Sequence, residues 1–144
     1  MVFQEHGDYK ISTDGDIIFL IAKGSWNLET TDHCIGIINE CIKKLSSDRF
    51  AFVTDTRELT GGTPDVLNAW INTLKYWPTI GMGAGSMIGD PNSANYRIYL
   101  AEFDRILSST IDFKCTDSFD EAVTWLNELG YNGFSSSKNS HIKP

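Results

Sequence analysis

Two uninterrupted apolar runs restrict this chain more than any other feature of its sequence. Residues 17–22 read IIFLIA, and residues 50–53 read FAFV. Strands buried on both faces of a sheet show continuous apolar runs, whereas half-exposed strands alternate polar and apolar residues. We therefore expect both runs to be central strands of a mainly parallel sheet that is covered on both faces.

The segments around these two runs predict a hairpin and a βαβ unit. A strand over residues 9–12 precedes the first run, and residues 13–16 (TDGD) between them form an Asp-Gly turn typical of a β-hairpin. A helix capped near Asn27 fits between the runs, because apolar residues recur there at steps of three and four. They are Cys34, Ile37, Ile38, Cys41, Ile42 and Leu45.

The second half of the chain continues the alternation. A second helix begins at residues 63–65 (TPD) and ends at residues 77–78 (WP). A glycine-rich strand is expected over residues 83–88, followed by a helix from Asn92 or Ser93 to Ser108. A short strand over residues 111–115 and a last helix, which starts at the capping box of residues 118–121 and stops at Gly130, complete the pattern.

The predicted fold class is therefore α/β, with the element order β-β-α-β-α-β-α-β-α. It implies a single, mostly parallel sheet with one antiparallel strand at the N-terminus. Residues 1–134 are expected to form one domain, since 144 residues is a common size for a single core. Residues 135–144 are polar and have little to bury, so we expect a flexible C-terminal tail.

Charge and hydropathy exclude several partners and cellular locations. The net charge is −7, from 19 acidic and 12 basic residues, so phosphate backbones would be repelled and we expect no nucleic acid partner. No stretch approaches the roughly 20 apolar residues that span a bilayer, so no stable membrane insertion is expected. The first ten residues lack the order of a secretory signal, which favours a cytoplasmic protein.

The element order and two short segments resemble the SpoIIAA-like, STAS-type domain family. These segments are residues 55–57 (DTR) after the third strand and residues 119–126 (FDEAVTWL), and the resemblance extends over residues 8–130. It implies a regulatory domain in which a kinase phosphorylates a Ser or Thr at the start of the helix after the third strand. The family's Asp-Ser-Ser-Gly-type motif is missing from residues 59–64 (LTGGTP), although Thr63 matches the place and Thr60 is close by. Other SpoIIAA-like proteins look related to lipid-binding CRAL-TRIO domains.

Ligands of open α/β sheets bind beyond the carboxyl ends of the parallel strands. Three loops are expected at that edge, over residues 24–27, 54–63 and 89–93. The candidate ligand- or partner-binding residues in them are Trp26, Asn27, Asp55, Thr56, Arg57, Asp90 and Asn92, and the candidate phospho-acceptors are Thr63 and Thr60. Simpler structural roles are open for several of them. Thr63 is also a suitable N-cap, Asp55 and Arg57 can satisfy backbone groups, and Trp26 can pack over the first helix.

Other chemical patterns in the sequence are weaker. Residues 81–85 (GMGAG) follow a helix and lack dinucleotide-binding spacing, so close packing against the strand is the better explanation of these glycines. A magnesium site on Asp55 and Asp90 lacks the adjacent acids that such sites use, and no nucleophile, base and acid set can be assembled. Tyr96, Tyr99 and Phe103 are expected in the core. If they are partly uncovered, they would form a patch for a homodimer or for another partner.

We therefore expect a non-enzymatic regulatory or protein-interaction module without metal or cofactor. Its partner would be a protein, either a regulator or a kinase. The alternative is a carrier that holds a small apolar molecule or a lipid in an apolar pocket at the carboxyl edge of the sheet.

Overall fold

The computed structural model describes residues 7–90, 92–94 and 100–133. The expected tail over residues 135–144, and Tyr96 and Tyr99 of the expected aromatic patch, lie outside these ranges. The elements follow the predicted order. They are β1 (Asp8–Asp14), β2 (Ile17–Trp26), α1 (Leu28–Lys44), β3 (Phe50–Gly62), α2 (Pro64–Tyr76), the short 3₁₀ helix η1 (Trp77–Ile80), β4 (Met82–Ile88), α3 (Ala101–Ser108), β5 (Asp112–Thr116) and α4 (Phe119–Glu128).

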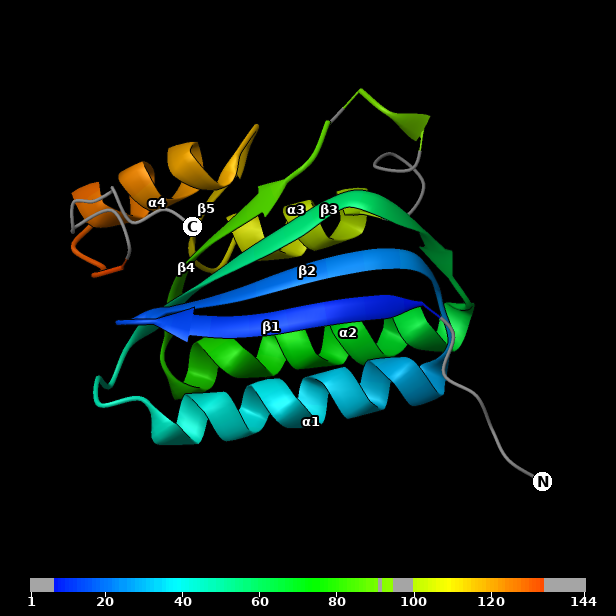
Figure 1. Cartoon of the computed structure of the whole chain (residues 1–144), viewed down its shortest axis with the longest axis horizontal. Coiled ribbons are helices and arrows are strands. Elements are labelled where there is room, and N and C mark those ends of the chain that lie inside the picture. The colour runs from blue at the N-terminus through cyan, green and yellow to red at the C-terminus, as the bar shows by residue number, and fades with distance from the viewer. Residues whose placement is uncertain (1–6, 91, 95–99, 134–144) are drawn as a thin grey trace.

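The five strands form one sheet in the order β1-β2-β3-β4-β5. β1 pairs antiparallel with β2, and the remaining pairs are parallel, which confirms the predicted fold class. Each parallel connection steps to the next strand in the same direction. Because such crossovers are right-handed, α1, α2 and α3 all cover the same face of the sheet. Of the helices in the described ranges, α4 alone lies on the opposite face, as Figure 1 shows.

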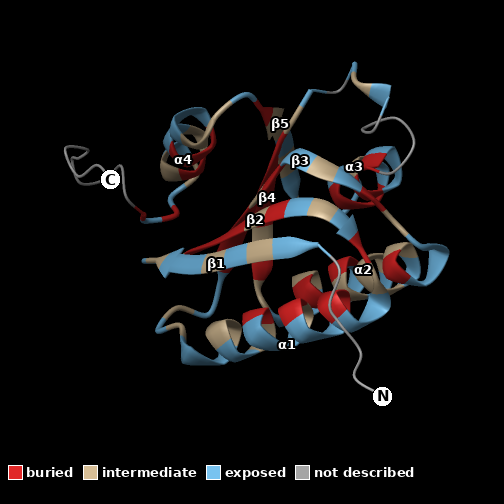
Figure 2. Ribbon diagram, turned by 45° about the vertical axis from the view of Figure 1, so that its right-hand side comes forward, coloured by how far each residue is buried: buried red, intermediate tan, exposed pale blue. Residues whose placement is uncertain are grey.

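Two hydrophobic clusters, one on each face, explain the continuous apolar runs. Ile18, Leu20 and Phe52 belong to the cluster beneath α1, α2 and α3, whereas Ile17 and Phe19 belong to the cluster beneath α4. Successive side chains of a strand point to opposite faces, so a strand covered on both faces has no position for a polar residue. Figure 2 shows the buried residues concentrated in the central strands and on the inner sides of the helices.

Side-chain caps fix the starts of two helices where the sequence predicted them. Asn27 is the N-cap of α1, and its side chain accepts a hydrogen bond from the Thr30 amide at 3.0 Å. Ser118 accepts one from the Glu121 amide at 3.1 Å at the start of α4. The predicted inner face of α1 is wrong at one position. Ile37 was expected to be buried there, but it is 38 % exposed.

The start predicted for the third helix, at Asn92 or Ser93, lies within two residues of Ala94, which is helical. The Ser93 amide donates to the Asp90 carbonyl, and the Asn92 amide donates to the Asp90 carboxylate. This Asx turn satisfies the backbone amides directly before the helical residue. α3 begins at Ala101, and residues 95–99 are outside the described part of the chain.

β3 is much longer than expected. Its apolar run ends at Val53, but the strand continues to Gly62 through the segment predicted to be a loop. Pairing with β2 stabilises this extension, and two extra residues of β3 are accommodated as bulges, one between Asp55 and Glu58 and one between Leu59 and Gly61. Bulges bend a strand and redirect its side chains, so they decide how the candidate site residues are presented.

The three cysteines, Cys34, Cys41 and Cys115, are free thiols, as the spacing on one helix suggested for the first two. Within the described ranges, no helix is long and apolar enough to cross a membrane.

Candidate functional site

The sequential strand order changes where a site can form. In doubly wound sheets, ligands bind where the strand order reverses and neighbouring loops diverge. Here the order never reverses, so the carboxyl edge has no such crevice. The predicted site residues therefore separate into a polar group around the bulge of β3 and a second group around the start of α2.

The polar group surrounds a recess of about 140 Å³ at the carboxyl edge of β3 and β4. The prediction that residues of two separate loops meet there holds for Thr56, Arg57 and Asp90. The remaining lining residues are Leu59, Gly89, Ser93 and Leu100. The hydroxyl of Thr56 is not available to a ligand as a donor, since it donates to the Ile88 carbonyl at 2.9 Å and ties β3 to β4.

Asp55 and Arg57 form a bidentate ion pair on the same face of the sheet as α4, beyond the part that this helix covers. Arg57 Nη2 and Nε donate to the two carboxylate oxygens at 2.8 and 3.0 Å, and the Arg57 amide donates to Oδ1 at 3.0 Å. The side chain of Asp55 is 11 % exposed and that of Arg57 is 51 % exposed. The structural alternative for this pair is therefore realised, because Asp55 satisfies both a backbone amide and its neighbour's guanidinium.

Burial and pairing act on Asp55 in opposite directions. Burial alone would raise the pKa of the carboxyl group, because it disfavours the charged form. The hydrogen bonds and the charge of Arg57 outweigh burial, and the pKa of Asp55 ends below its ordinary value. The same hydrogen bonds raise the pKa of Arg57. Asp55 is consequently a carboxylate at neutral pH and has no proton to donate to a substrate.

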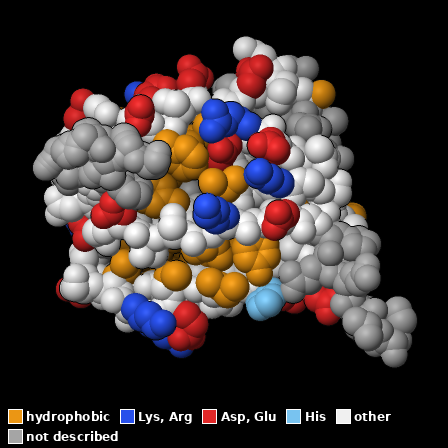
Figure 3. Space-filling model, in the orientation of Figure 1, with side chains coloured by type: hydrophobic (Ala, Val, Ile, Leu, Met, Phe, Trp, Pro, Cys, Tyr) orange, Lys and Arg blue, Asp and Glu red, His pale blue; other side chains and the backbone are white. Residues whose placement is uncertain are grey.

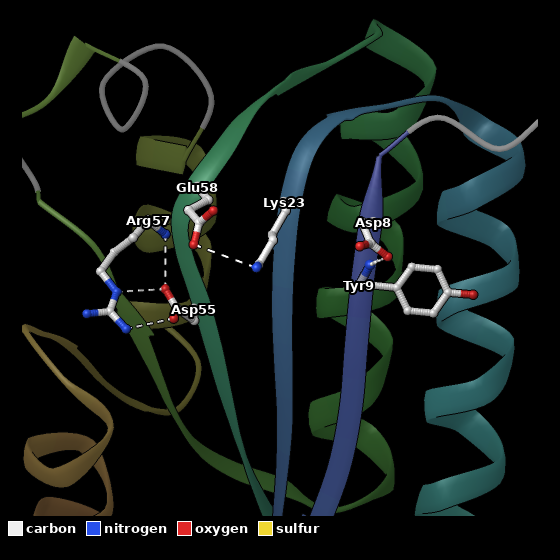
Figure 4. Close-up of polar contacts among 6 residues, drawn as sticks. All are labelled: Asp8, Tyr9, Lys23, Asp55, Arg57 and Glu58. Carbon is white, nitrogen blue, oxygen red and sulfur yellow. Dashed lines mark hydrogen bonds and ion pairs between the residues drawn. The ribbon is translucent and has the colours of Figure 1, made fainter.

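The surrounding face carries further paired charges. Lys23 lies 3.8 Å from Glu58, and Figure 4 shows this pair beside the Asp55–Arg57 pair on neighbouring strands. In Figure 3 basic and acidic side chains alternate across the middle of this face, with hydrophobic side chains visible between them. Among the described residues, no group of three potential metal ligands comes together.

The second group of candidates lies where β2 and β3 end and α2 begins. Thr63 is exposed and occupies the N-cap position of α2, but its side chain makes no capping hydrogen bond. Its hydroxyl donates instead to Asp65 Oδ1 through a short contact, and that same oxygen accepts from the Val66 amide at 3.1 Å. Asp65 thus caps the helix in place of Thr63. Thr60 is exposed in the second bulge, where its hydroxyl lies 2.8 Å from that of Ser25.

Trp26 does not stand in an exposed loop, because β2 extends to include it and only 3 % of its surface is exposed. Its indole nitrogen donates to the Lys23 carbonyl at 3.0 Å, and its ring contacts Tyr9 and Trp70. Packing, the alternative considered for this residue, is its structural role, but against β1 and α2. Asn27 is fully explained as the cap of α1.

An apolar cavity of about 80 Å³ lies between the sheet and the layer formed by α2 and α3. Trp26 is one of the predicted ligand-binding residues that line it. Thr56 also lines it, and so do Leu20, Ala22, Phe52, Thr54, Leu59, Gly61, Gly62, Val66, Leu67, Trp70, Leu74, Met82, Gly85, Ser86, Met87, Leu100, Phe103, Leu107 and Phe113. Thr56, Leu59 and Leu100 line the polar recess as well, so the two spaces adjoin.

Most of the cavity wall was not identified from the sequence, since these residues were assigned only to the core. The available signal was a set of small residues on three successive strands, namely Ala22, Gly61, Gly62 and Gly85. The strand glycines were expected to allow close packing, and Gly83 confirms this. A Cβ there would lie 2.3 Å from the Tyr131 hydroxyl. Gly85 differs, because the nearest atoms to a Cβ there are 3.4 Å away.

Comparisons with known proteins identify the fold. The sequence matches no family model and no curated protein. Among solved structures, an uncharacterised Shewanella loihica protein with a SpoIIAA-like fold has a TM-score of 0.62 and 15 % identity, covering 88 % of this chain and 98 % of that one. The Bacillus cell fate determinant SpoIIAA in its phosphorylated form has a TM-score of 0.57 and 10 % identity, covering 83 % of this chain and 99 % of that one. An anti-sigma factor antagonist from Mycobacterium paratuberculosis has a TM-score of 0.55 and 15 % identity, covering 84 % of this chain and 94 % of that one. The chain therefore has the SpoIIAA-like fold that the resemblance predicted.

Proposed function

We propose that this protein is a non-enzymatic regulatory module that binds a protein partner and is switched by phosphorylation at the start of α2. The observation that carries the proposal is the place of Thr63. It is exposed, it follows the last residue of β3, and it stands at the N-terminus of a 13-residue helix. One neighbour of the same fold is an anti-sigma factor antagonist, and another is a cell fate determinant in its phosphorylated form. Both support this choice.

The start of α2 suits a phosphoryl group in one respect and resists it in another. The positive end of the helix dipole favours an anion at this position. Pro64 has no N–H to offer it, however, and the Val66 and Leu67 amides already donate to the Thr63 carbonyl at 3.0 and 3.2 Å. Asp65 already supplies such an anion, because its carboxylate accepts from the Thr63 hydroxyl and the Val66 amide. A phosphoryl group on Thr63 would remove the hydroxyl proton and repel the Asp65 carboxylate. Modification would therefore rebuild the first turn as well as add charge, which makes the unmodified form the one we expect to bind the partner.

Partner capture with charge-mimicking variants tests the proposal. Wild-type protein, Thr63→Glu and the matched control Thr124→Glu are immobilised and exposed to extract from the cells that produce the protein. Thr124 is exposed on α4, on the opposite side of the sheet. We expect a protein that wild type and Thr124→Glu retain and Thr63→Glu releases. Identical partners for all three variants, or phosphate that is never found on Thr63 or Thr60, would contradict the switch.

The apolar cavity supports a second function, that of a small-molecule carrier. All of its lining residues except Thr54, Thr56 and Ser86 are apolar or glycine, and it lies next to a polar recess. Pockets that bind small molecules combine such an apolar wall with a few polar groups. Native mass spectrometry of the protein from its own cells tests this function. A retained non-covalent ligand that disappears under denaturing conditions is expected, and a bare chain in every preparation argues against it.

A further inference from the structure

We propose that the cavity and the recess together bind a small amphiphile that carries a protonated amine on a short aliphatic chain. The inference rests on the carrier function proposed above and names the class of ligand. The apolar chain occupies the cavity beneath α2 and α3, and the ammonium group lies in the recess beside Asp90. Three features of the structure lead to this assignment.

The first feature is the size of the cavity. Its volume of about 80 Å³ is roughly half that of the ~150 Å³ cavity known to hold benzene in another protein. It therefore accommodates about three or four carbon atoms. Leu100, Leu59 and Thr56 belong to both walls, so the two spaces are neighbours. The proposed ligand, with a slightly longer chain, passes between these side chains from the cavity into the recess.

The second feature is the absence of a place for a charge inside the cavity. Two of its three hydroxyl-bearing residues are already engaged. Thr56 donates to the Ile88 carbonyl at 2.9 Å, and Ser86 shares a hydrogen bond of 2.9 Å with Thr116. Among the described residues, no charged side chain lines the cavity. A charged head group buried there would lose its hydration without compensation, so it must remain in the recess.

The third feature is the charge of the recess, which selects the head group. Arg57 and Asp90 line it, but the guanidinium of Arg57 is held by both carboxylate oxygens of Asp55. With that pair neutralised, Asp90 is the remaining charge among the described lining residues. Its carboxylate is exposed and accepts from the Asn92 amide at 2.9 Å. A cation is attracted to this position and a carboxylate is repelled, and the net charge of −7 acts in the same direction.

Indole signals in ¹H–¹⁵N spectra provide an internal measure of binding. The chain has four tryptophans. Trp26 and Trp70 line the cavity, whereas Trp125 lies on α4 across the sheet. We would titrate the protein with n-pentylamine, n-pentanol and sodium pentanoate, which share one chain and differ in head group. Pentylamine should shift the signals of Trp26 and Trp70, leave that of Trp125 in place, and bind with a dissociation constant on the order of 1 mM.

Selectivity and two pairs of variants complete the test. Pentylamine should bind about tenfold tighter than pentanoate, as expected for one exposed carboxylate some 6 Å from the head group in a dielectric close to that of water. Asp90→Asn should remove most of that preference, and the control Asp112→Asn, at the exposed start of β5, should keep it. Ala22→Leu should fill the cavity and abolish binding, whereas Ala101→Leu adds the same atoms on the exposed side of α3.

The outcomes separate the inference from the function on which it rests. If the three probes bind equally and Ala22→Leu abolishes all binding, the carrier function stands and the amine assignment is wrong. If none of them shifts Trp26 or Trp70, both are wrong. Should Ala22→Leu fail to fold, Gly85→Ala replaces it. Gly85 lines the same cavity, and a Cβ there meets no atom closer than 3.4 Å, so weaker binding is again expected.

Discussion

Removal of the Arg57 side chain should destabilise the protein, because it leaves the Asp55 carboxylate almost buried without its partner. Two hydrogen bonds to a charged group, at 2.8 and 3.0 Å, would be lost. Breaking a fully buried ion pair costs about 3–5 kcal/mol. Arg57 is half exposed, however, and water can replace part of its interaction. We therefore expect Arg57→Ala to lower the free energy of unfolding by about 1–2 kcal/mol.

Urea unfolding followed by tryptophan fluorescence measures this loss as a shift of the midpoint at constant slope. Lys23→Ala is the matched control. Its ion pair with Glu58 spans 3.8 Å between exposed side chains, so a loss below about 0.5 kcal/mol is expected. In a double-mutant cycle, Asp55→Asn with Arg57→Ala should cost less than the sum of the single variants, because the two residues interact directly.

The loss should also depend on pH. The pKa of Asp55 is lower in the folded protein than its ordinary value of 3.8. A carboxyl group with a lowered pKa stabilises the folded state above the unfolded pKa, and this stabilisation disappears as the pH falls through the folded pKa. The difference between wild type and Arg57→Ala should therefore be complete near neutral pH and shrink below pH 3.8. Equal losses for Arg57→Ala and Lys23→Ala, or a difference that persists in acid, would refute this reasoning.

Two further predictions concern a cap and a close contact. Ser118→Ala should cost about 1 kcal/mol, because its hydroxyl caps α4, whereas Thr63→Ala should cost less than about 0.5 kcal/mol, because its hydroxyl caps nothing. Equal losses in urea unfolding would contradict the assigned roles. Gly83→Ala should destabilise the protein by about 1–3 kcal/mol, since a Cβ would lie 2.3 Å from the Tyr131 hydroxyl. Tyr131→Phe in the same chain should restore part of the loss, and no recovery would assign the strain elsewhere.

The element order could be predicted because each element carries its own local signal. The apolar runs at residues 17–22 and 50–53, the Asp-Gly turn and the caps Asn27 and Ser118 are all read within a few residues of the structure they form. The extension of β3 had no such signal. Residues 60–62 (TGG) favour a loop by composition, and pairing with β2, more than thirty residues earlier in the chain, overrides that preference.

The candidate site was predicted in part for the same reason. Strand ends placed Thr56, Arg57 and Asp90 around one recess without knowledge of any contact. Two other features depend on rotamers and bulges that residue spacing does not reveal. They are the ion pair that holds Arg57 and the capping of α2 by Asp65 in place of Thr63. An apolar pocket was part of the alternative hypothesis, but most of its lining residues could not be named. Small residues such as Gly85 leave the space, and they lie on strands whose register the sequence does not specify.

The central claim, that Thr63 controls partner binding, is tested most directly by mapping phosphate on the native protein after its partner-bound and partner-free forms have been separated. Peptide mass spectrometry of both fractions locates the modification. We predict one phosphoryl group on Thr63 in the partner-free fraction and an unmodified Thr63 in the bound fraction. An unmodified Thr63 in both fractions, or phosphate distributed equally between them, would contradict the account.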